Sequence, residues 1–365
     1  MKTNLREGLS LVEKSVSENA NLAILKNVLC VADDTGLTLT ATNLEVAASC
    51  VIAGKVIEPG RVTIPAGVFS ALVNNLPSER ISLETHDDRL DIESENYQGQ
   101  LVGLPADDYP LIPAIEKKDE WIEMEGALMK EAFSQVITAA QASDIRPELG
   151  SVLFHFSLNT IILVATDVFR LAEKTIQGNQ FKHYYKEELR RLIPLKTIQE
   201  VLRITKDDER VMIFFDDNQV LFKTKTYEFI SRLINGNFPD YGGIIPKEFN
   251  AEIVVNRQDF MRAVKLSGVL GGKNNEVCIA MAKAGKTIEV FSSDQVVGEN
   301  TSIIIGKISG SFEKVTFNWR YLIDGLKALK NEDVFLGINK DNKPALLKDT
   351  KDSSYFYLLA PLLNS

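Results

Sequence analysis

An aspartate and an arginine follow a hydrophobic run in the segment IILVATDVFRLAE, residues 161–173. A carboxylate beside a guanidinium suits catalysis, with Asp167 as a general base and Arg170 as a clamp for an anionic substrate. The spacing equally suits a strand-ending turn, because an Asp side chain accepts hydrogen bonds from the backbone N–H groups that follow it. A third interpretation places Thr166 and Arg170 in a ligand pocket. Which one holds depends on whether the chain supplies partners for chemistry.

Such partners are not evident elsewhere in the sequence. The three histidines lack HxxxH spacing, the three cysteines lack CxxC spacing, and the glycine-rich segment 266–276 lacks the spacing of a phosphate-binding loop. These residues are His86, His155, His183, Cys30, Cys50 and Cys278. The sequence therefore predicts no catalytic set, no metal and no cofactor, and the turn is the favoured interpretation of Asp167.

The composition is that of a globular protein, with 45% hydrophobic and 25% charged residues among 365. A chain of this length predicts two or three domains. No apolar run reaches the roughly 20 residues of a membrane span, and the charged N-terminal segment does not resemble a secretory signal. We therefore expect a cytoplasmic protein that does not bind membranes. The net charge of −9 argues against a nucleic-acid partner unless the basic residues gather on one face.

Four features recur in the same order along the chain. A β-like run ending in Thr or Ser and then Asn or Asp places Asn43, Asp167 and Asp294 at matching positions. A strand followed by a helix recurs at residues 61–77, 191–205 and 314–330, and an amphipathic helix recurs at 5–16, 128–140 and 260–269. Tyr109-Pro110 matches Phe238-Pro239. The sequence predicts three tandem α+β domains of about 120 residues, at 1–121, 122–250 and 251–365.

The predicted helices carry cations opposite their apolar stripes, as in 128–140, where Leu128, Ala132, Val136 and Ala140 face the core and Lys130 faces outward. Surface helices carry lysines in any case. If the helices share one surface, however, these cations form a modestly basic lining that binds phosphates without reading bases. The cations are Lys14, Lys130, Lys196, Arg203, Arg262, Lys265, Arg320 and Lys327. Ser70 and Asp324 also fall on outward faces, Asn318 can cap the last helix, and the helices of the first third carry few cations.

Four segments, ATDVFRLA, SDIRPELGSVLF, RLINGNFPDY and the terminal YLLAPLLNS, resemble the beta sliding clamp of bacterial DNA polymerase III. The resemblance covers the whole chain in order. It implies a ring-forming homodimer with sheets outside and two helices per domain lining a central hole. Such a ring encircles double-stranded DNA without sequence specificity and is not an enzyme. The implied partners are the replicative polymerase, the clamp loader and other proteins that carry a clamp-binding motif.

The resemblance also implies a pocket between the second and third domains that takes a short partner peptide. An apolar cleft with a few polar groups suits a peptide anchored by Leu and Phe. The matching positions are Arg146, Leu149, Thr166, Val168, Phe169, Arg170, Leu171, Pro246, Asn318, Tyr321, Leu358, Leu359, Ala360, Pro361, Leu362 and Leu363.

The sequence departs from the family in two parts of this pocket. Val168-Phe169 stands where the family usually has Gly-His, and Ala360-Pro361-Leu362-Leu363 where it usually has Met-Pro-Met-Arg. We expect both changes to reshape the pocket and narrow its range of partners. Tyr109 and Leu266 match the dimer seam. Lys265 also falls near a seam position, so the resemblance allows it either at the dimer seam or on the DNA-facing pore. The runner-up function is a small-molecule enzyme that uses an Asp167/Arg170 cleft.

Overall fold

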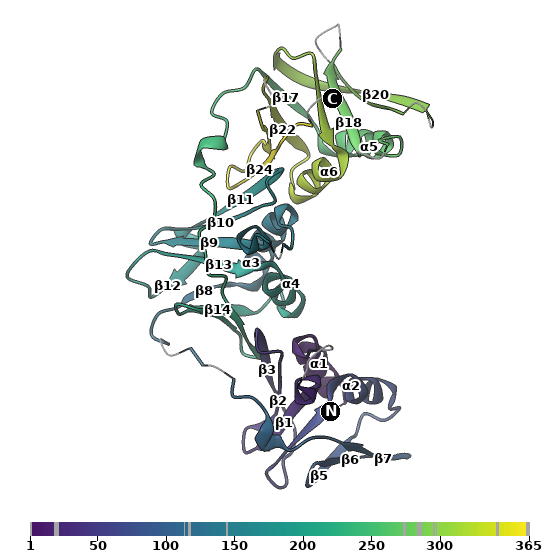
Figure 1. Ribbon diagram of the computed structural model, residues 1–365, viewed down its shortest axis with the longest axis vertical. Coiled ribbons are helices and arrows are strands. Elements are labelled where there is room, and N and C mark those ends of the chain that lie inside the picture. Colours follow the sequence, from purple (N-terminus) through teal and green to yellow (C-terminus); the bar gives the residue numbers. More distant parts are fainter. Residues whose placement is uncertain are drawn as a thin grey trace. The chain divides into compact units, whose positions relative to one another are not determined.

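The structure, a computed structural model, describes residues 2–17, 22–112, 114–115, 118–143, 145–272, 275–282, 287–294, 296, 298–340 and 343–362. In these residues the chain forms six α-helices and 24 strands (Figure 1). They fall into two compact units. The first holds residues 1–129, 181–185 and 199–233, and the second holds residues 130–180, 186–198 and 234–365.

The first unit contains a nine-stranded antiparallel sheet and a separate three-stranded sheet. The large sheet has the order β12-β8-β14-β15-β16-β3-β2-β1-β4, and the small one the order β5-β6-β7. The strands are β1 (Asn27–Asp33), β2 (Gly36–Thr42), β3 (Val46–Ile52), β4 (Gly60–Pro65), β5 (Ser82–His86), β6 (Arg89–Ser94), β7 (Tyr97–Val102), β8 (Ile122–Glu125), β12 (Phe181–His183), β14 (Arg210–Phe215), β15 (Gln219–Lys223) and β16 (Tyr227–Arg232).

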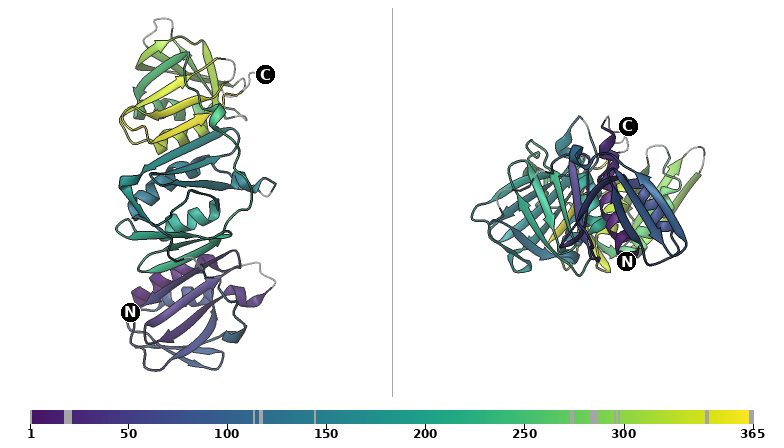
Figure 2. Two further views of the ribbon diagram at one scale, coloured as in Figure 1. Left: turned by 90° about the vertical axis from the view of Figure 1, so that its left-hand side faces the viewer. Right: turned by 90° about the horizontal axis from the view of Figure 1, so that it is seen from below.

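The second unit contains one twelve-stranded sheet with the order β13-β9-β10-β11-β24-β23-β22-β17-β20-β19-β18-β21. Figure 2 shows the yellow C-terminal strands continuing the teal strands of the chain's middle third. The strands are β9 (Ser151–Ser157), β10 (Thr160–Thr166), β11 (Arg170–Gln177), β13 (Leu189–Pro194), β17 (Ala251–Asn256), β18 (Glu276–Met281), β19 (Thr287–Asp294), β20 (Gly298–Gly310), β21 (Lys314–Asn318), β22 (Asp333–Ile338), β23 (Ala345–Asp349) and β24 (Tyr355–Leu359).

All six predicted helices are present. They are α1 (Lys2–Val12), α2 (Ala66–Asn75), α3 (Gly126–Val136), α4 (Leu195–Ile204), α5 (Arg257–Gly268) and α6 (Trp319–Ala328). Pro65 and Pro194 each end a strand directly before a helix, where a missing N–H costs no helical hydrogen bond. The predicted cap is confirmed, because Asn318 Oδ1 accepts a hydrogen bond of 3.0 Å from the Arg320 N–H. In Figure 1, α1 lies beside α2, and α5 beside α6.

Two predicted helix faces need correction. The core stripe of α3 begins at Met129 and continues through Ala132, Phe133 and Val136, whereas Leu128 is half-buried. Ser70 in α2, expected to face outward, is buried and donates a hydrogen bond of 2.8 Å to Glu13. A glutamate on a neighbouring helical turn can make a polar side chain part of the core, and helical periodicity alone does not reveal this.

The predicted α+β fold of three tandem domains is confirmed. We use domain I, II and III for residues 1–121, 122–250 and 251–365, the predicted ranges. Two joints connect consecutive domains through strand pairing. At the I–II joint β3 pairs with β16, and at the II–III joint β11 pairs with β24. Because each joint is an unbroken antiparallel ladder, each large sheet is shared by two domains.

Two searches of the described residues gave negative results. No helix among them has both the length and the hydrophobicity to cross a membrane. No group of three or more His, Cys, Asp and Glu side chains among them is placed to hold a metal ion.

Candidate functional site

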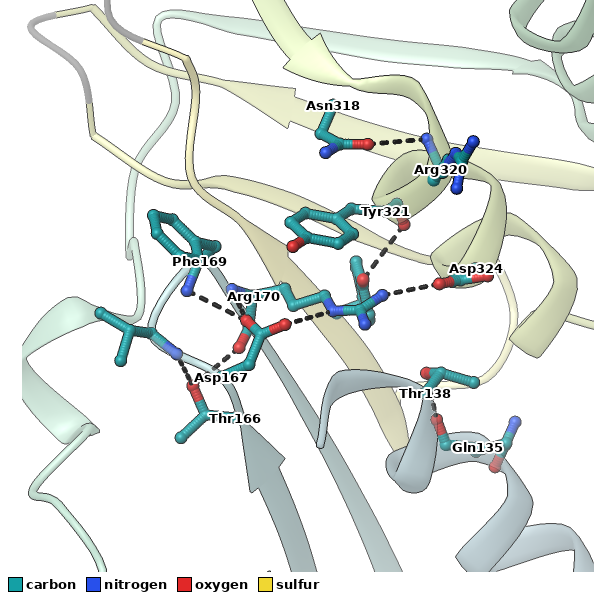
Figure 3. A network of polar contacts seen from close by, with 12 residues as sticks. Gln135, Thr138, Thr166, Asp167, Phe169, Arg170, Asn318, Arg320, Tyr321 and Asp324 are labelled. Carbon is teal, nitrogen blue, oxygen red and sulfur yellow. Dashed lines mark hydrogen bonds and ion pairs between the residues drawn. The ribbon is translucent and has the colours of Figure 1, made fainter. Parts of the chain in front are cut away.

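The turn after β10 is held together by the side chains of Thr166 and Asp167 (Figure 3). Thr166 Oγ1 donates to the carbonyl of Arg170 at 2.7 Å and accepts from the Val168 N–H at 3.3 Å. Asp167 Oδ1 accepts from the backbone N–H groups of Phe169 and Arg170, both at 3.1 Å. Asp167 is only 7% exposed. Its carboxylate thus closes a turn, as the sequence favoured.

Domain I contains the same turn with an amide in place of the carboxylate. Thr42 Oγ1 donates to the Val46 carbonyl at 2.8 Å, and Asn43 Oδ1 accepts from the Val46 N–H at 2.9 Å. Leu44 and Val168 both take positive φ angles, of 73° and 81°. Since the neutral Asn43 does the same work as Asp167, the turn does not need an ionisable base. The hypothesis of an Asp167-based enzyme gains no support.

The guanidinium of Arg170 joins the turn to helix α6. Its Nε lies 2.8 Å from Asp167 Oδ2, and its Nη1 lies 2.6 Å from Asp324 Oδ2. The guanidinium carbon also lies 4.1 Å from the centre of the Tyr321 ring, a cation–π geometry. The Arg170 side chain is only 11% exposed. Its charge is therefore shared between two carboxylates and an aromatic face.

Electrostatics keep this arginine charged. Burial lowers the pKa of Arg170, but Tyr357 and then Asp324 and Asp167 outweigh burial, so the pKa lies above its ordinary value. Burial raises the pKa of Tyr357, whose hydroxyl donates to the Tyr321 carbonyl at 3.0 Å. Sequence reasoning expected Asp324 to face outward, whereas the structure places it half-buried against Arg170.

The C-terminal tail closes onto the same turn. The Ala360 N–H donates to the Phe169 carbonyl at 2.8 Å, directly after the last pair of the β11–β24 ladder, Arg170 with Leu359. The Leu362 N–H donates to the Thr316 carbonyl of β21, also at 2.8 Å. Residues 360–362 are half-buried. The structure therefore brings the turn, α6 and the tail together.

The other predicted pocket residues divide into two groups. Leu171, Leu358 and Leu359 are buried, and Leu171 and Leu358 belong to a hydrophobic cluster beneath the turn. They support the site from below. Arg146 precedes the 3-10 helix Pro147–Gly150, in which Leu149 is buried, and half-buried Pro246 lies in the linker before β17. Leu363 lies outside the described residues.

Two apolar side chains of the turn are exposed. Val168 is 62% and Phe169 57% exposed. A β-branched residue at positive φ is strained, because its Cβ crowds the following carbonyl oxygen. A glycine at this position would avoid the strain, so Val168 retains an apolar surface at a conformational cost.

The variant Val168→Gly is expected to raise the free energy of unfolding by about 1 kcal/mol, the strain relieved less the entropy cost of glycine. Urea denaturation measures the change. Leu44→Gly, at the matching turn of domain I, should gain a similar amount, and Val168→Ala should gain less because it keeps a Cβ. A lower midpoint for Val168→Gly would contradict this account of the turn.

Of the eight cations predicted on the helices, seven are exposed and one is half-buried. Lys130 is half-buried, and exposed Arg203 is engaged, with Nη1 2.8 Å from the Ser10 carbonyl and Nε 2.9 Å from Glu200. Arg203 therefore satisfies the C-terminal end of α1. The other six exposed cations are Lys14, Lys196, Arg262, Lys265, Arg320 and Lys327.

The sequence interpretation missed Arg6. It is exposed on α1, between buried Leu5 and Gly8. Arg6 lies within the predicted helix 5–16, where the helical pattern singled out only Lys14 as an outward cation. The helix itself begins at Lys2, three residues before the predicted start. Domain I is therefore less poor in cations than predicted.

The two seam residues have different environments. Leu266 on α5 is 54% exposed, but Tyr109 is only 7% exposed and its hydroxyl donates to the carbonyls of Asn27 and Thr40. The seam role of Tyr109 stays a prediction, and little of the residue is exposed, because its ring belongs to a core cluster with Ile24 and Leu25. A ring largely enclosed in its own domain presents only a small apolar surface to a second subunit.

Exposed apolar residues near Leu266 were not predicted. Val269 is 77% exposed, and Ile303 and Ile305 on β20 are 68% and 82% exposed. The Asn300 side chain links β20 to α5 through a hydrogen bond of 2.9 Å to the Leu266 carbonyl. The run SIII in the sequence is typical of a buried strand, and only the alternation around buried Ile304 reveals the two outward isoleucines.

The comparisons with known proteins agree with this architecture. Three models of the DNA polymerase III beta subunit match the chain in order: its N-terminal domain at residues 1–113, its central domain at 123–240 and its C-terminal domain at 243–363. The beta sliding clamp of Bacillus subtilis is 29% identical over 374 residues, covering 99% of this chain and 98% of that protein. That of Staphylococcus epidermidis is 29% identical over 360 residues, covering 96% and 94%.

Solved structures show the same fold. The DNA polymerase sliding clamp of Bacillus subtilis has a TM-score of 0.92 at 28% identity, and the DNA polymerase III beta chain of Streptococcus pneumoniae has 0.93 at 26%. In each comparison the match covers 100% of this chain and 98% of the other. Three family domains match in order, on a chain whose turns at Asn43 and Asp167 share the same hydrogen bonds. This protein therefore belongs to the family of DNA polymerase III beta subunits, the beta sliding clamps.

Proposed function

We propose that this protein is a DNA polymerase processivity factor, a homodimeric ring that encircles duplex DNA without sequence specificity. The observation that carries the proposal is the match of all three family domains, in order, along one chain. The role is a non-enzymatic one in the cytoplasm. Because a closed ring is held by topology, it keeps a tethered polymerase on DNA without reading any base.

The proposed DNA-facing side chains are the cations of the helices. Exposed Lys and Arg heads reach phosphate oxygens, which fix position without sequence information. Besides Arg203, which is bonded to the end of α1, six of the eight predicted cations are exposed, and Arg6 adds a further one. This supports a basic surface on a protein of net charge −9. The proposed set is Arg6, Lys14, Lys196, Arg262, Lys265, Arg320 and Lys327, with Lys130 and Arg203 as lesser contributors.

The proposed dimer seam uses two strand edges. Residues 298–305 of β20 pair with β19 alone among the described strands, and β7 is an edge of the three-stranded sheet. Unpaired edges pair readily with another chain. Leu266, Val269, Ile303 and Ile305 supply apolar area beside the first edge, and Val102, 65% exposed, lies at the end of β7. We place the seam between β20 of one subunit and β7 of the other.

The proposed partner site combines the exposed turn with the tail and α6. Val168 and Phe169 offer apolar surface, and Tyr321 and residues 360–362 are half-buried beside the same turn. Such a surface suits short peptides with Leu or Phe anchors, bound at about micromolar affinity and exchanged quickly. The proposed partners are the replicative polymerase, the clamp loader and other clamp-motif proteins.

Light scattering coupled to size-exclusion chromatography tests the ring. We expect twice the chain mass of 40.6 kDa at micromolar concentration. Loaded on circular DNA by a clamp loader, the protein should stay bound in buffer exchange and leave when the circle is linearised. The matched control is the same DNA linearised before loading. A monomer that neither remains on circles nor stimulates a polymerase would overturn the proposal.

A further inference from the structure

Strand β11 carries two deeply buried cations on one face. The side chains of Arg170 and Lys174 are only 11% and 5% exposed. Residues four apart in a strand point to the same side of the sheet, roughly 13 Å from each other along the chain. Lys and Arg are almost never this buried unless they are paired. The two positions therefore call for compensating charges.

Each cation is compensated by one acid from domain II and one from domain III. Arg170 contacts Asp167 of domain II and Asp324 of domain III, as described above. Lys174 Nζ lies 3.7 Å from Glu131 of domain II and 3.8 Å from Asp352 of domain III. It also donates to Ser354 Oγ at 2.8 Å. Both cations thus bridge the II–III joint.

The I–II joint provides an internal comparison. When the turns of Asn43 and Asp167 are aligned, Val46 is the domain I equivalent of Arg170. Cys50 is likewise the equivalent of Lys174. Val46 and Cys50 pair with Ser231 and Tyr227, just as Arg170 and Lys174 pair with Leu359 and Tyr355. The same ladder therefore forms at the I–II joint with two apolar side chains.

The ion pairs between domains I and II are of a different kind. Lys206 Nζ lies 3.5 Å from Glu7 Oε2, and their side chains are 61% and 59% exposed. Arg232 lies 3.7 Å from Glu45, and their side chains are 60% and 69% exposed. Exposed pairs contribute little to stability. The pairing of strands does not require buried charge, so the two cations of β11 serve a purpose beyond joining the sheets.

We propose that Lys174 is a positioning residue which, with Arg170, locks the II–III joint in a single arrangement. A buried ion pair adds little net stability over apolar residues, but breaking one half is costly, and this disfavours alternative geometries. The lock sets the tail of domain III against the turn of domain II. These are the two halves of the proposed partner site, so the effect on peptide binding rests on the proposed function. Lys174 itself lies four residues beyond the turn.

Amide hydrogen exchange on the full-length protein tests the lock without any ligand. Lys174→Met should speed exchange across Tyr355–Leu359 by about tenfold, because the contacts of Lys174 Nζ with Glu131, Asp352 and Ser354 Oγ across the joint are lost. Lys330, whose Nζ lies 2.6 Å from Glu131, remains and compensates part of the acidic charge. Adding Asp352→Asn should restore part of the protection by removing one of the two like charges. The control Arg232→Met should leave the β3–β16 ladder unchanged. Unaltered exchange of β24 in Lys174→Met, or no rescue in the double variant, would overturn the lock.

Binding of a fluorescein-labelled hexapeptide ending in Leu-Phe tests the positioning role. When only part of the population holds the competent arrangement, the apparent Kd rises in proportion. We expect Lys174→Met to weaken binding several-fold and the double variant to recover part of the loss. Faster exchange with unchanged affinity would overturn the positioning role. Failure of the wild-type protein to bind would instead refute the partner site, while the exchange result still decides the lock.

Discussion

Replacing Arg170 by methionine is expected to lower the free energy of unfolding of the II–III region by about 3–5 kcal/mol. Methionine fills a similar volume but leaves Asp167, whose side chain is 2% exposed, without its cation. An unpaired buried carboxylate is among the costliest defects that a single substitution creates. Trp319 is the first residue of α6, the helix that carries Tyr321 and Asp324, so urea unfolding followed by fluorescence in a Trp121→Phe background reports the change.

Two further substitutions separate charge from geometry at this position. Asp324→Asn should cost only about 1 kcal/mol, because the Asp324 side chain is 37% exposed and solvent replaces part of its contact. Arg170→Lys keeps the charge but loses the planar fork that reaches two carboxylates, and should fall between the other two variants. If Arg170→Met and Asp324→Asn lowered the free energy of unfolding by the same small amount, the buried charge of Asp167 would not need Arg170 for its compensation.

Removing residues 362–365 is expected to weaken binding of the labelled peptide by about 100-fold, on the order of 3 kcal/mol. The bond from the Leu362 N–H to the Thr316 carbonyl holds the tail across β21, and residues 360–362 lie against the turn that exposes Phe169. Fluorescence anisotropy measures the affinity. Light scattering should still give twice the chain mass, because the proposed seam lies on β20 and β7.

The position of the cut matters for the interpretation of this experiment. Leu359 is 2% exposed and pairs with both Arg170 and Ala345, so a deletion that begins there removes part of a central strand. Ending the chain at Pro361 keeps β24 whole, together with the bond from the Ala360 N–H to Phe169. A truncated protein that binds the peptide normally, or that runs as a monomer, would contradict the assignment of the site.

The features that the sequence predicted well are those that depend on residues close together along the chain. The turn chemistry of Thr and Asn or Asp recurs at Asn43 and Asp167, and its hydrogen bonds repeat in the structure. Helices follow from the 3.6-residue period, and the cap at Asn318 follows from its amide. The threefold organisation is the sum of these local signals, so it could be deduced without any knowledge of long-range contacts.

The features that the sequence did not predict depend on pairs far apart along the chain. Asp324 lies 154 residues from Arg170, and only the pairing of β11 with β24 brings them together. Lys174 is of a residue type that is usually exposed, and Tyr109 is of a type that is common at interfaces. Both are buried in this structure. These side-chain contacts depend on which strands pair in the folded sheet. The periodicity of the sequence carries no information about that pairing.

Sharing each large sheet between two domains has a consequence for how such a chain arises. A domain expressed alone would have unpaired edge strands. These would be β3 or β16 at the I–II joint, and β11 or β24 at the II–III joint. Unpaired edge strands of this length pair with strands of other molecules, so isolated single domains would polymerise. Fusing three copies in one polypeptide satisfies two of these contacts within the molecule, at a high effective concentration, and leaves only the outermost edges for a second chain.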